Sequence, residues 1–181
     1  FLIGQNCRIK SLYIITLIYI SIVERFRNYS SLIAVQGWLL LGIALLRLHT
    51  LDWMELSFII TETLIFKALI VPGILMRVIK KTGINRISST GTSQFNSLML
   101  SITALTISAI LTYYVADQTI NMIFFGVALY ALLTGLILIV LRSRIFTHMV
   151  GFLVIENGVF LFSMAIGVEM PLLINAAIML D

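Results

Sequence analysis

A carboxylate lies in the most apolar part of the chain, near the C-terminus. Glu156 belongs to the stretch IFTHMVGFLVIENGVFLFSMAIGV (145–168), which is long enough to cross a lipid bilayer. An ionisable side chain at that depth is costly, and in membrane proteins it usually marks an ion or proton path or a buried pair. Glu156 is therefore our first candidate for a group that gains and loses a proton inside a membrane.

Three more ionisable residues fall inside apolar stretches: Glu62, Lys67 and Asp181. Counting about 1.5 Å per residue from the ends of the stretches puts Lys67, Glu156 and Asp181 near mid-bilayer. Glu62 and Lys67 are about 140° apart around one helix, so Lys67 needs a partner on another helix. The pattern predicts either a lateral layer of proton-exchanging groups or buried ion pairs that tie helices together.

The neighbours of Glu156 suit proton transfer. Asn157 supplies both a hydrogen-bond donor and an acceptor. His148 lies two turns, or about 12 Å, along the same helix and titrates near neutral pH. We therefore add both residues to the candidate proton-transfer set, although His148 also fits a place at the membrane interface beside Arg142 and Arg144.

A proline follows Lys67 in the sequence LIFKALIVPGILM. Pro72 removes the hydrogen bond to the carbonyl of Ala68 and predicts a helix break next to the lysine. A carbonyl freed in this way can bind water or an ammonium group. An ordinary proline kink, common in membrane helices, is the alternative.

Composition identifies the class of protein. The chain has 181 residues, of which 60% are hydrophobic and 11% charged, and this excludes a water-soluble globule. The net charge of +4 comes from short loops and does not form a nucleic-acid-binding patch. Cys7, His49 and His148 cannot build an iron–sulfur or zinc site and offer at most a weak haem candidate, so we expect no metal, cofactor or catalytic residue in this chain.

Hydropathy predicts an all-α fold, a polytopic bundle of about seven transmembrane helices. The expected helices cover residues 11–23, 31–48, 53–79, 94–116, 119–141 and 145–168, with a truncated seventh that begins near Pro171. The polar start FLIGQNCRIK is either a preceding segment or part of the first helix. We divide the chain into an N-terminal four-helix region, 1–117, and a three-helix module, 118–181, and expect it to be part of a longer protein.

Basic residues gather in alternate loops and predict the orientation. By the positive-inside rule these loops face the cytoplasm, which puts the loops of Asp117 and Glu169 outside. The cytoplasmic cations are Arg25, Arg27, Arg77, Lys80, Lys81, Arg86, Arg142 and Arg144, while Arg8, Lys10 and Arg47 fall on the other side.

The stretch HMVGFLVIENGVFLFSMAIGVEMPLLINAAIMLD (148–181) resembles hydrogenase-4 component E, a membrane subunit of group 4 nickel–iron hydrogenases. The resemblance extends upstream through TETLIFKALIVPGILMR and IAVQGWLLLGIALL to about Leu12. Residues from about Thr119 are also similar to the K-type subunit of respiratory complex I and to the C subunit of multi-subunit cation/proton antiporters. In the K-type pattern two successive helices each carry a glutamate of the proton path, and Glu156 and Asp181 occupy these places.

The resemblance implies a multi-pass subunit of the prokaryotic cytoplasmic (inner) membrane. Its partners would be antiporter-like and quinone-site-like membrane subunits and a peripheral redox arm that holds a nickel–iron centre and iron–sulfur clusters. The chain itself would be a non-catalytic subunit that moves protons or sodium ions. Two alternatives stay open: a subunit of a cation/proton antiporter without a redox partner, and a structural scaffold in which the charged residues are interhelical ties.

Overall fold

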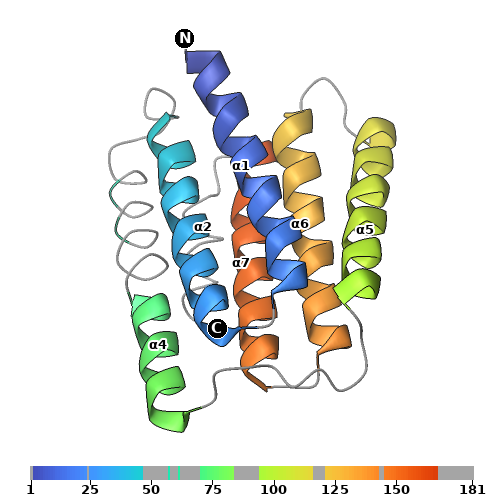
Figure 1. The fold of residues 1–181 in the computed structure, drawn as a ribbon. Helices are drawn as coiled ribbons and strands as arrows, with labels where there is room; N and C mark the ends of the chain where they lie inside the picture. The colour runs from blue at the N-terminus through green and yellow to red at the C-terminus, as the bar shows by residue number, and fades with distance from the viewer. Residues whose placement is uncertain are drawn as a thin grey trace. The chain divides into compact units, whose positions relative to one another are not determined.

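The structure is a computed structural model that describes residues 2–23, 25–46, 57, 61, 70–83, 94–115, 121–142 and 145–166. The side chains of residues 2–7, 26, 44–46, 82, 94 and 166 are excepted. Within these ranges the chain forms six helices and no strand (Figure 1). The helices group into two compact units, residues 1–90 and 91–181, which are described separately below.

The first unit contains three described helices: α1 (Leu2–Ile22), α2 (Phe26–Leu46) and α4 (Val71–Thr82). Helices α1 and α2 run antiparallel: Gly42 lies beside Ile9, and Gln36 Nε2 donates a hydrogen bond of 3.4 Å to Thr16 Oγ1. Helix α4 is tied to α2 by Ser30, whose hydroxyl donates to the Pro72 carbonyl at 3.0 Å. It ends at Gly83, which has a φ of 66° and a backbone N–H that donates to the carbonyl of Ile79.

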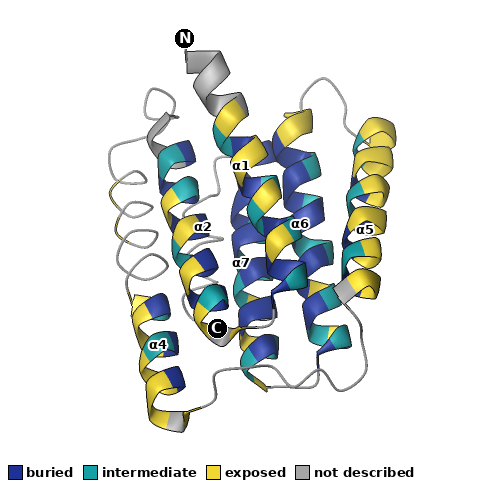
Figure 2. Cartoon of the chain, in the orientation of Figure 1, coloured by how far each residue is buried: buried dark blue, intermediate teal, exposed yellow. Residues whose placement is uncertain are grey.

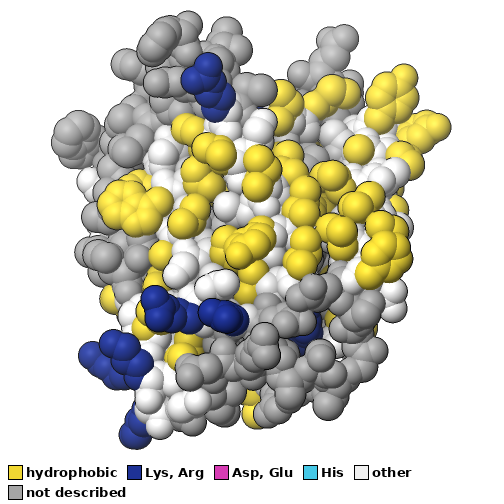
Figure 3. Space-filling model, in the orientation of Figure 1, with side chains coloured by type: hydrophobic (Ala, Val, Ile, Leu, Met, Phe, Trp, Pro, Cys, Tyr) yellow, Lys and Arg dark blue, Asp and Glu magenta, His cyan; other side chains and the backbone are white. Residues whose placement is uncertain are grey.

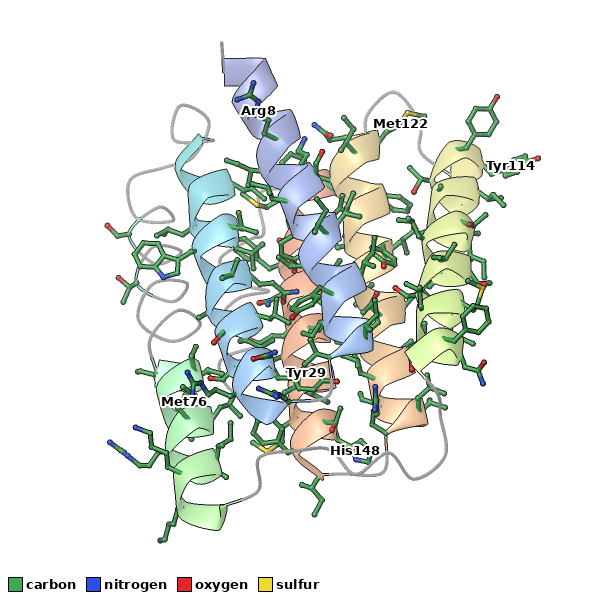
Figure 4. The ribbon with its side chains drawn as sticks, viewed as in Figure 1. Arg8, Tyr29, Met76, Tyr114, Met122 and His148 are labelled. Atoms are coloured by element: carbon green, nitrogen blue, oxygen red, sulfur yellow. The ribbon has the colours of Figure 1, made fainter. Side chains whose placement is uncertain are left out.

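The polar start of the chain is part of the first helix. Helix α1 begins at Leu2, so the predicted start at residue 11 is too late by more than two turns. Arg8 and Lys10, which the positive-inside rule places opposite the basic loops, therefore lie on this helix. Arg8 is exposed and Lys10 is buried (Figure 4 labels Arg8). Backbone hydrogen bonding continues through this polar sequence even though its mean hydropathy is low, because Gln, Arg, Lys and Leu all have good helix propensity.

The second unit is an antiparallel row of three helices: α5 (Gln94–Val115), α6 (Met122–Leu141) and α7 (Ile145–Ile166). Their bounds agree within three residues with the predicted spans. Asn121 caps α6 by accepting a 3.5 Å hydrogen bond from the backbone N–H of Phe124. Tyr114 and Met122 mark one end of the unit and His148 the other (Figure 4).

Small residues bring α6 and α7 into close contact. Gly135 on α6 faces Gly151 on α7, and a Cβ on either would lie within 3 Å of the other's carbonyl oxygen. Gly158 packs in the same way against Ala128 and Ala131. We call this line of contacts the glycine seam. Small residues at a helix interface allow two helices to approach closely in a membrane, and the glycine seam is an interface of this kind.

Three helices of the described chain, α5, α6 and α7, are long and apolar enough to cross a membrane. Half of the residues in the apolar membrane-spanning segment of α6 are buried, whereas only 17% of those in the corresponding segment of α5 are. Helix α6 therefore lies inside the row and α5 at its edge (Figure 2). Hydrophobic side chains are exposed along α5 (Figure 3). Such an apolar surface is costly in water and suits contact with lipid tails.

Candidate functional site

Glu156 lies at the middle of α7, about 16 Å from each end at 1.5 Å per residue. The glycine seam is centred on Gly151, Val154 and Gly158, and at about 100° per residue Glu156 points roughly 160° away from it. Ile145, Met149 and Phe152, on the side of Glu156, are all more than half exposed. Glu156 is therefore a half-buried carboxylate on the face of α7 that α6 leaves uncovered.

Asn157 is 3% exposed and lies about 100° around the helix from Glu156. Both residues have interaction partners. The amide and the carboxylate thus sit at one depth of α7 but point in different directions. This arrangement keeps two hydrogen-bonding groups in the centre of an otherwise apolar helix, as the sequence predicts.

His148 is positioned at the start of α7 by the end of α6. Its Nε2 donates a hydrogen bond to the backbone carbonyl of Arg142. Because a carbonyl only accepts, Nε2 is the protonated nitrogen in this contact. No hydrogen-bonding side chain of α7 lies between His148 and Glu156, so the relay predicted between them has a gap on this helix of about 12 Å.

Arg142 differs from an ordinary loop cation. It lies between α6 and α7, as predicted, but its side chain is only 6% exposed, and its Nη2 atom is buried without a hydrogen-bond partner. Three hydroxyls of the second unit share this property: Ser97 Oγ in the first turn of α5, Thr134 Oγ1 in α6 and Thr147 Oγ1 in the first turn of α7. The sequence does not reveal this, since an arginine in a short basic loop is normally solvated.

A buried hydrogen bond joins the other side of α6 to α5. Ser101 Oγ and the Tyr130 hydroxyl are 2.6 Å apart, and both residues have no exposed surface. Ser101 belongs to a small-residue stripe with Ser97, Ala104 and Ser108 that recurs every three to four residues on α5. Sequence analysis missed this pair, although the stripe of serines at helical spacing is the signal that points to it.

Three of the predicted site residues, Glu62, Lys67 and Asp181, lie outside the described residues, so their meeting with Glu156 stays a prediction. Pro72 is described: it is the second residue of α4 and is buried. Ile70, just before this helix, has right-handed helical backbone angles. The helix break predicted at Pro72 concerns the carbonyl of Ala68, which is also outside the described residues.

The described residues contain no group of three or more His, Cys, Asp or Glu side chains that could hold a metal ion. They define a helical protein with three helices able to cross a membrane and a carboxylate at the centre of one of them. Comparisons with protein-family models, with curated proteins and with solved structures find no match.

Proposed function

We propose that the chain is a multi-pass subunit of a hydrogenase-type, complex-I-like assembly in a prokaryotic cytoplasmic membrane, and that its intramembrane carboxylates take part in proton or sodium translocation. Electron transfer would occur in a peripheral arm, where partner subunits hold the nickel–iron centre and the iron–sulfur clusters. The complete bundle of about seven transmembrane helices belongs to the same proposal. The observation that carries it is Glu156, a carboxylate at the centre of a helix long and apolar enough to span a bilayer.

The position of Glu156 on its helix supports a translocation role. A carboxylate buried in a static pair is normally enclosed on all sides, whereas Glu156 is half-buried on the side of α7 away from the glycine seam. It can therefore meet groups outside the α6–α7 pair. Asp181 and Lys67 are the partners that we propose from the sequence, with Glu62, His148 and Asn157 as further members of the path.

In this mechanism Glu156 takes up a proton from one direction and releases it in another. The glycine seam holds α7 against α6, so the carboxylate keeps its depth while its partners change. A change of charge in the redox arm would alter the balance between protonated and ionised Glu156 through the other members of the layer. The rigid α6–α7 pair would keep Glu156 at a fixed depth, and the changing charge of its partners would determine when it binds or releases a proton.

The first experiment identifies the assembly. The full chain is extracted from its native membrane in mild detergent, and the co-purifying subunits, nickel and iron are measured. Nickel with iron–sulfur subunits is the expected result. Iron–sulfur subunits without nickel would move the chain to another complex-I-like oxidoreductase, and antiporter subunits without metal would favour cation/proton exchange.

The second experiment tests the carboxylate. Glu156→Gln keeps the size of the side chain and one acceptor oxygen but cannot ionise, so ion translocation should fall at least tenfold while the complex still assembles. Glu156→Asp should keep part of the activity, and Glu24→Gln, a carboxylate between the first two helices, serves as the control. A Glu156→Gln complex that translocates normally contradicts the proposal, and loss of assembly in both variants at Glu156 would indicate a structural tie.

A further inference from the structure

Helix α4 in the first unit has a buried side and an exposed side. Pro72, Leu75 and Ile79 are buried, and the Ser30 hydroxyl of α2 donates to the Pro72 carbonyl on this side. The opposite side is exposed within the described part of the chain. An exposed helix face at a membrane contacts lipid, water or another subunit, and the residue types on the face distinguish these three environments.

The exposed side of α4 combines aliphatic side chains with cations. Ile70, Ile74 and Val78 are 38%, 50% and 44% exposed, and their four-residue spacing puts them on one stripe of the helix. Arg77 and Lys81 are also exposed, and each follows one of these aliphatic residues by three positions, about 60° around the helix. Aliphatic side chains next to cations are typical of a helix at a membrane surface, where the first contact acyl chains and the second reach the headgroups.

The contact between Ser30 and Pro72 gives the level of α4 relative to the membrane. Hydropathy predicts that the spanning part of α2 begins at residue 31, directly after Ser30. From this contact α2 runs into the predicted span, and α4 runs in the opposite direction (Figure 1). Arg77 and Lys81 therefore lie about 8 and 14 Å along the helix beyond Pro72, at the level of the headgroups and the adjoining water. Because Cα–Cβ bonds tilt toward the helix N-terminus, these long side chains can reach back to the headgroups.

Two cations of α2 add to the positive charge at this level. Arg25 directly precedes α2 and Arg27 belongs to its first turn, and both are exposed. The antiparallel register set by the Ser30–Pro72 contact places them near the level of Arg77. Figure 3 shows Lys and Arg side chains gathered beyond the apolar surface, over α4 and the start of α2. We call the exposed cations of this region the basic surface: Arg25, Arg27, Arg77, Lys80 and Lys81.

The sequence offers little negative charge to balance the basic surface. Residues 25–51 and 63–116, which include all of α2 and α4, contain no Asp or Glu. Glu24, which lies outside the described residues, directly precedes Arg25 and can neutralise one of the cations. The remaining charge makes the basic surface complementary to an anionic partner.

We propose that the basic surface binds the headgroups of anionic phospholipids and that Ile74 and Val78 contact their acyl chains. An acidic protein would neutralise the same cations but would place polar groups against the exposed aliphatic stripe, whereas a lipid matches both. Juxtamembrane cations near an anionic membrane surface each add to the binding. The proposal depends on the location of the chain in a membrane and not on proton movement at Glu156.

The test compares two lipids that differ in headgroup charge. The full chain, purified with its natural partners in neutral detergent, is equilibrated with equal amounts of dioleoyl-phosphatidylglycerol and dioleoyl-phosphatidylcholine, which have the same tails and both contain a phosphate. The lipids that remain after gel filtration are quantified by mass spectrometry. We expect a preference for phosphatidylglycerol at low salt, and about 0.5 M salt should reduce it because exposed charges are screened.

Variants locate the lipid on the basic surface. Arg77→Gln/Lys81→Gln should lose at least one retained molecule of phosphatidylglycerol per chain, whereas Arg77→Lys/Lys81→Arg, which keeps both charges, should behave as the wild type. Arg8→Gln removes an exposed cation near the start of α1, at the other end of the first unit, and should also retain the wild-type amount (Figure 4). All these side chains are exposed, so the thermal stability of the lipid-free protein should not change.

The aliphatic stripe distinguishes a lipid from an acidic protein. Ile74→Ser/Val78→Ser keeps every charge but should also lower the retention of phosphatidylglycerol, because the contact with the acyl chains is lost. Equal retention in the wild type and in Arg77→Gln/Lys81→Gln would overturn the proposal. Loss of a co-purifying subunit from that variant, with unchanged lipid, would likewise overturn it and would assign the basic surface to an acidic protein partner.

Discussion

Individual polar side chains in the second unit are placed by different kinds of contact. Ser101 and Tyr130 satisfy each other inside the row, and His148 is fixed by a backbone carbonyl. Arg142 and Thr147 are buried with atoms that have no partner. Glu156 is half-buried on the far side of its helix. Hydropathy predicts the position of each residue along its helix but not the side of the helix on which its side chain lies. That side determines whether the side chain is paired inside the row, buried without a partner or left partly exposed.

The Ser101–Tyr130 hydrogen bond should behave as a coupled pair. Ser101→Ala and Tyr130→Phe each leave a buried hydroxyl without its partner, and each should lower the free energy of unfolding by about 1 kcal/mol. The double variant should lose less than the two single losses combined, because neither hydroxyl of the pair is then left without the other. Denaturation in mixed micelles, followed by circular dichroism, gives the coupling. Additive losses would mean that the two hydroxyls do not interact.

Helices α6 and α7 form the most closely packed pair of the second unit, and the seam explains why. Without side chains at Gly135 and Gly151, the two backbones approach to within the distance at which a Cβ would collide with a carbonyl oxygen. Van der Waals contact between close backbones is a main source of helix association in lipid. A rigid pair of this kind positions Glu156 on one side and closes the other.

Gly135→Ala should separate the pair. The new Cβ would lie 2.7 Å from the carbonyl oxygen of Gly151 and 2.5 Å from Ile155 Cγ1, and a backbone atom cannot rotate away. We expect a loss of about 1–3 kcal/mol, typical of overpacking, in thermal or denaturant unfolding.

The matched control is Gly73→Ala on α4. This glycine is exposed and a Cβ there meets no atom within 4 Å, so alanine should be neutral or slightly stabilising through its better helix propensity. Equal changes in the free energy of unfolding for Gly135→Ala and Gly73→Ala would show that helix propensity, and not packing at the glycine seam, determines the effect of the substitution.

The predictability of the elements differs along the chain. The starts of α5 and α7 and the end of α6 were predicted at the observed residues, because Gln94, Leu141 and Ile145 stand at sharp changes from polar to apolar sequence. Helix α6 starts at Met122 instead of 119, because Asn121 caps it. The start of α1 was predicted too late, since hydropathy detects apolar runs and not helical hydrogen bonding. The burial of Arg142 depends on packing between helices that are distant in sequence.

Exposed basic residues lie on α4, and a pair of exposed tyrosines lies at the C-terminal end of α5. Arg77, Lys80 and Lys81 are exposed on α4 (Figure 3). Tyr113 and Tyr114, at the far end of α5, are 77% and 80% exposed and form an edge-to-face pair. Exposed tyrosines at the end of an apolar helix are typical of a membrane interface, and the cations are typical of the cytoplasmic side.

Cysteine labelling checks the resulting orientation. In a chain whose Cys7 has been replaced by serine, Lys81→Cys should react with a membrane-impermeant maleimide only after the cytoplasmic side is opened. Tyr114→Cys should react in intact cells, because the positive-inside rule puts the end of α5 outside. The opposite pattern would invert the topology, and labelling of both positions from one side would contradict the predicted number of spans between them.

The glycine seam also determines how water can reach the carboxylate. A methyl group does not fit between Gly135 and Gly151, and a water molecule, which is of similar size, does not fit either. A continuous chain of water molecules therefore cannot pass between α6 and α7. Hydration of Glu156 has to come from the opposite side of α7, so the groups that cover this side form the walls of any aqueous channel to it.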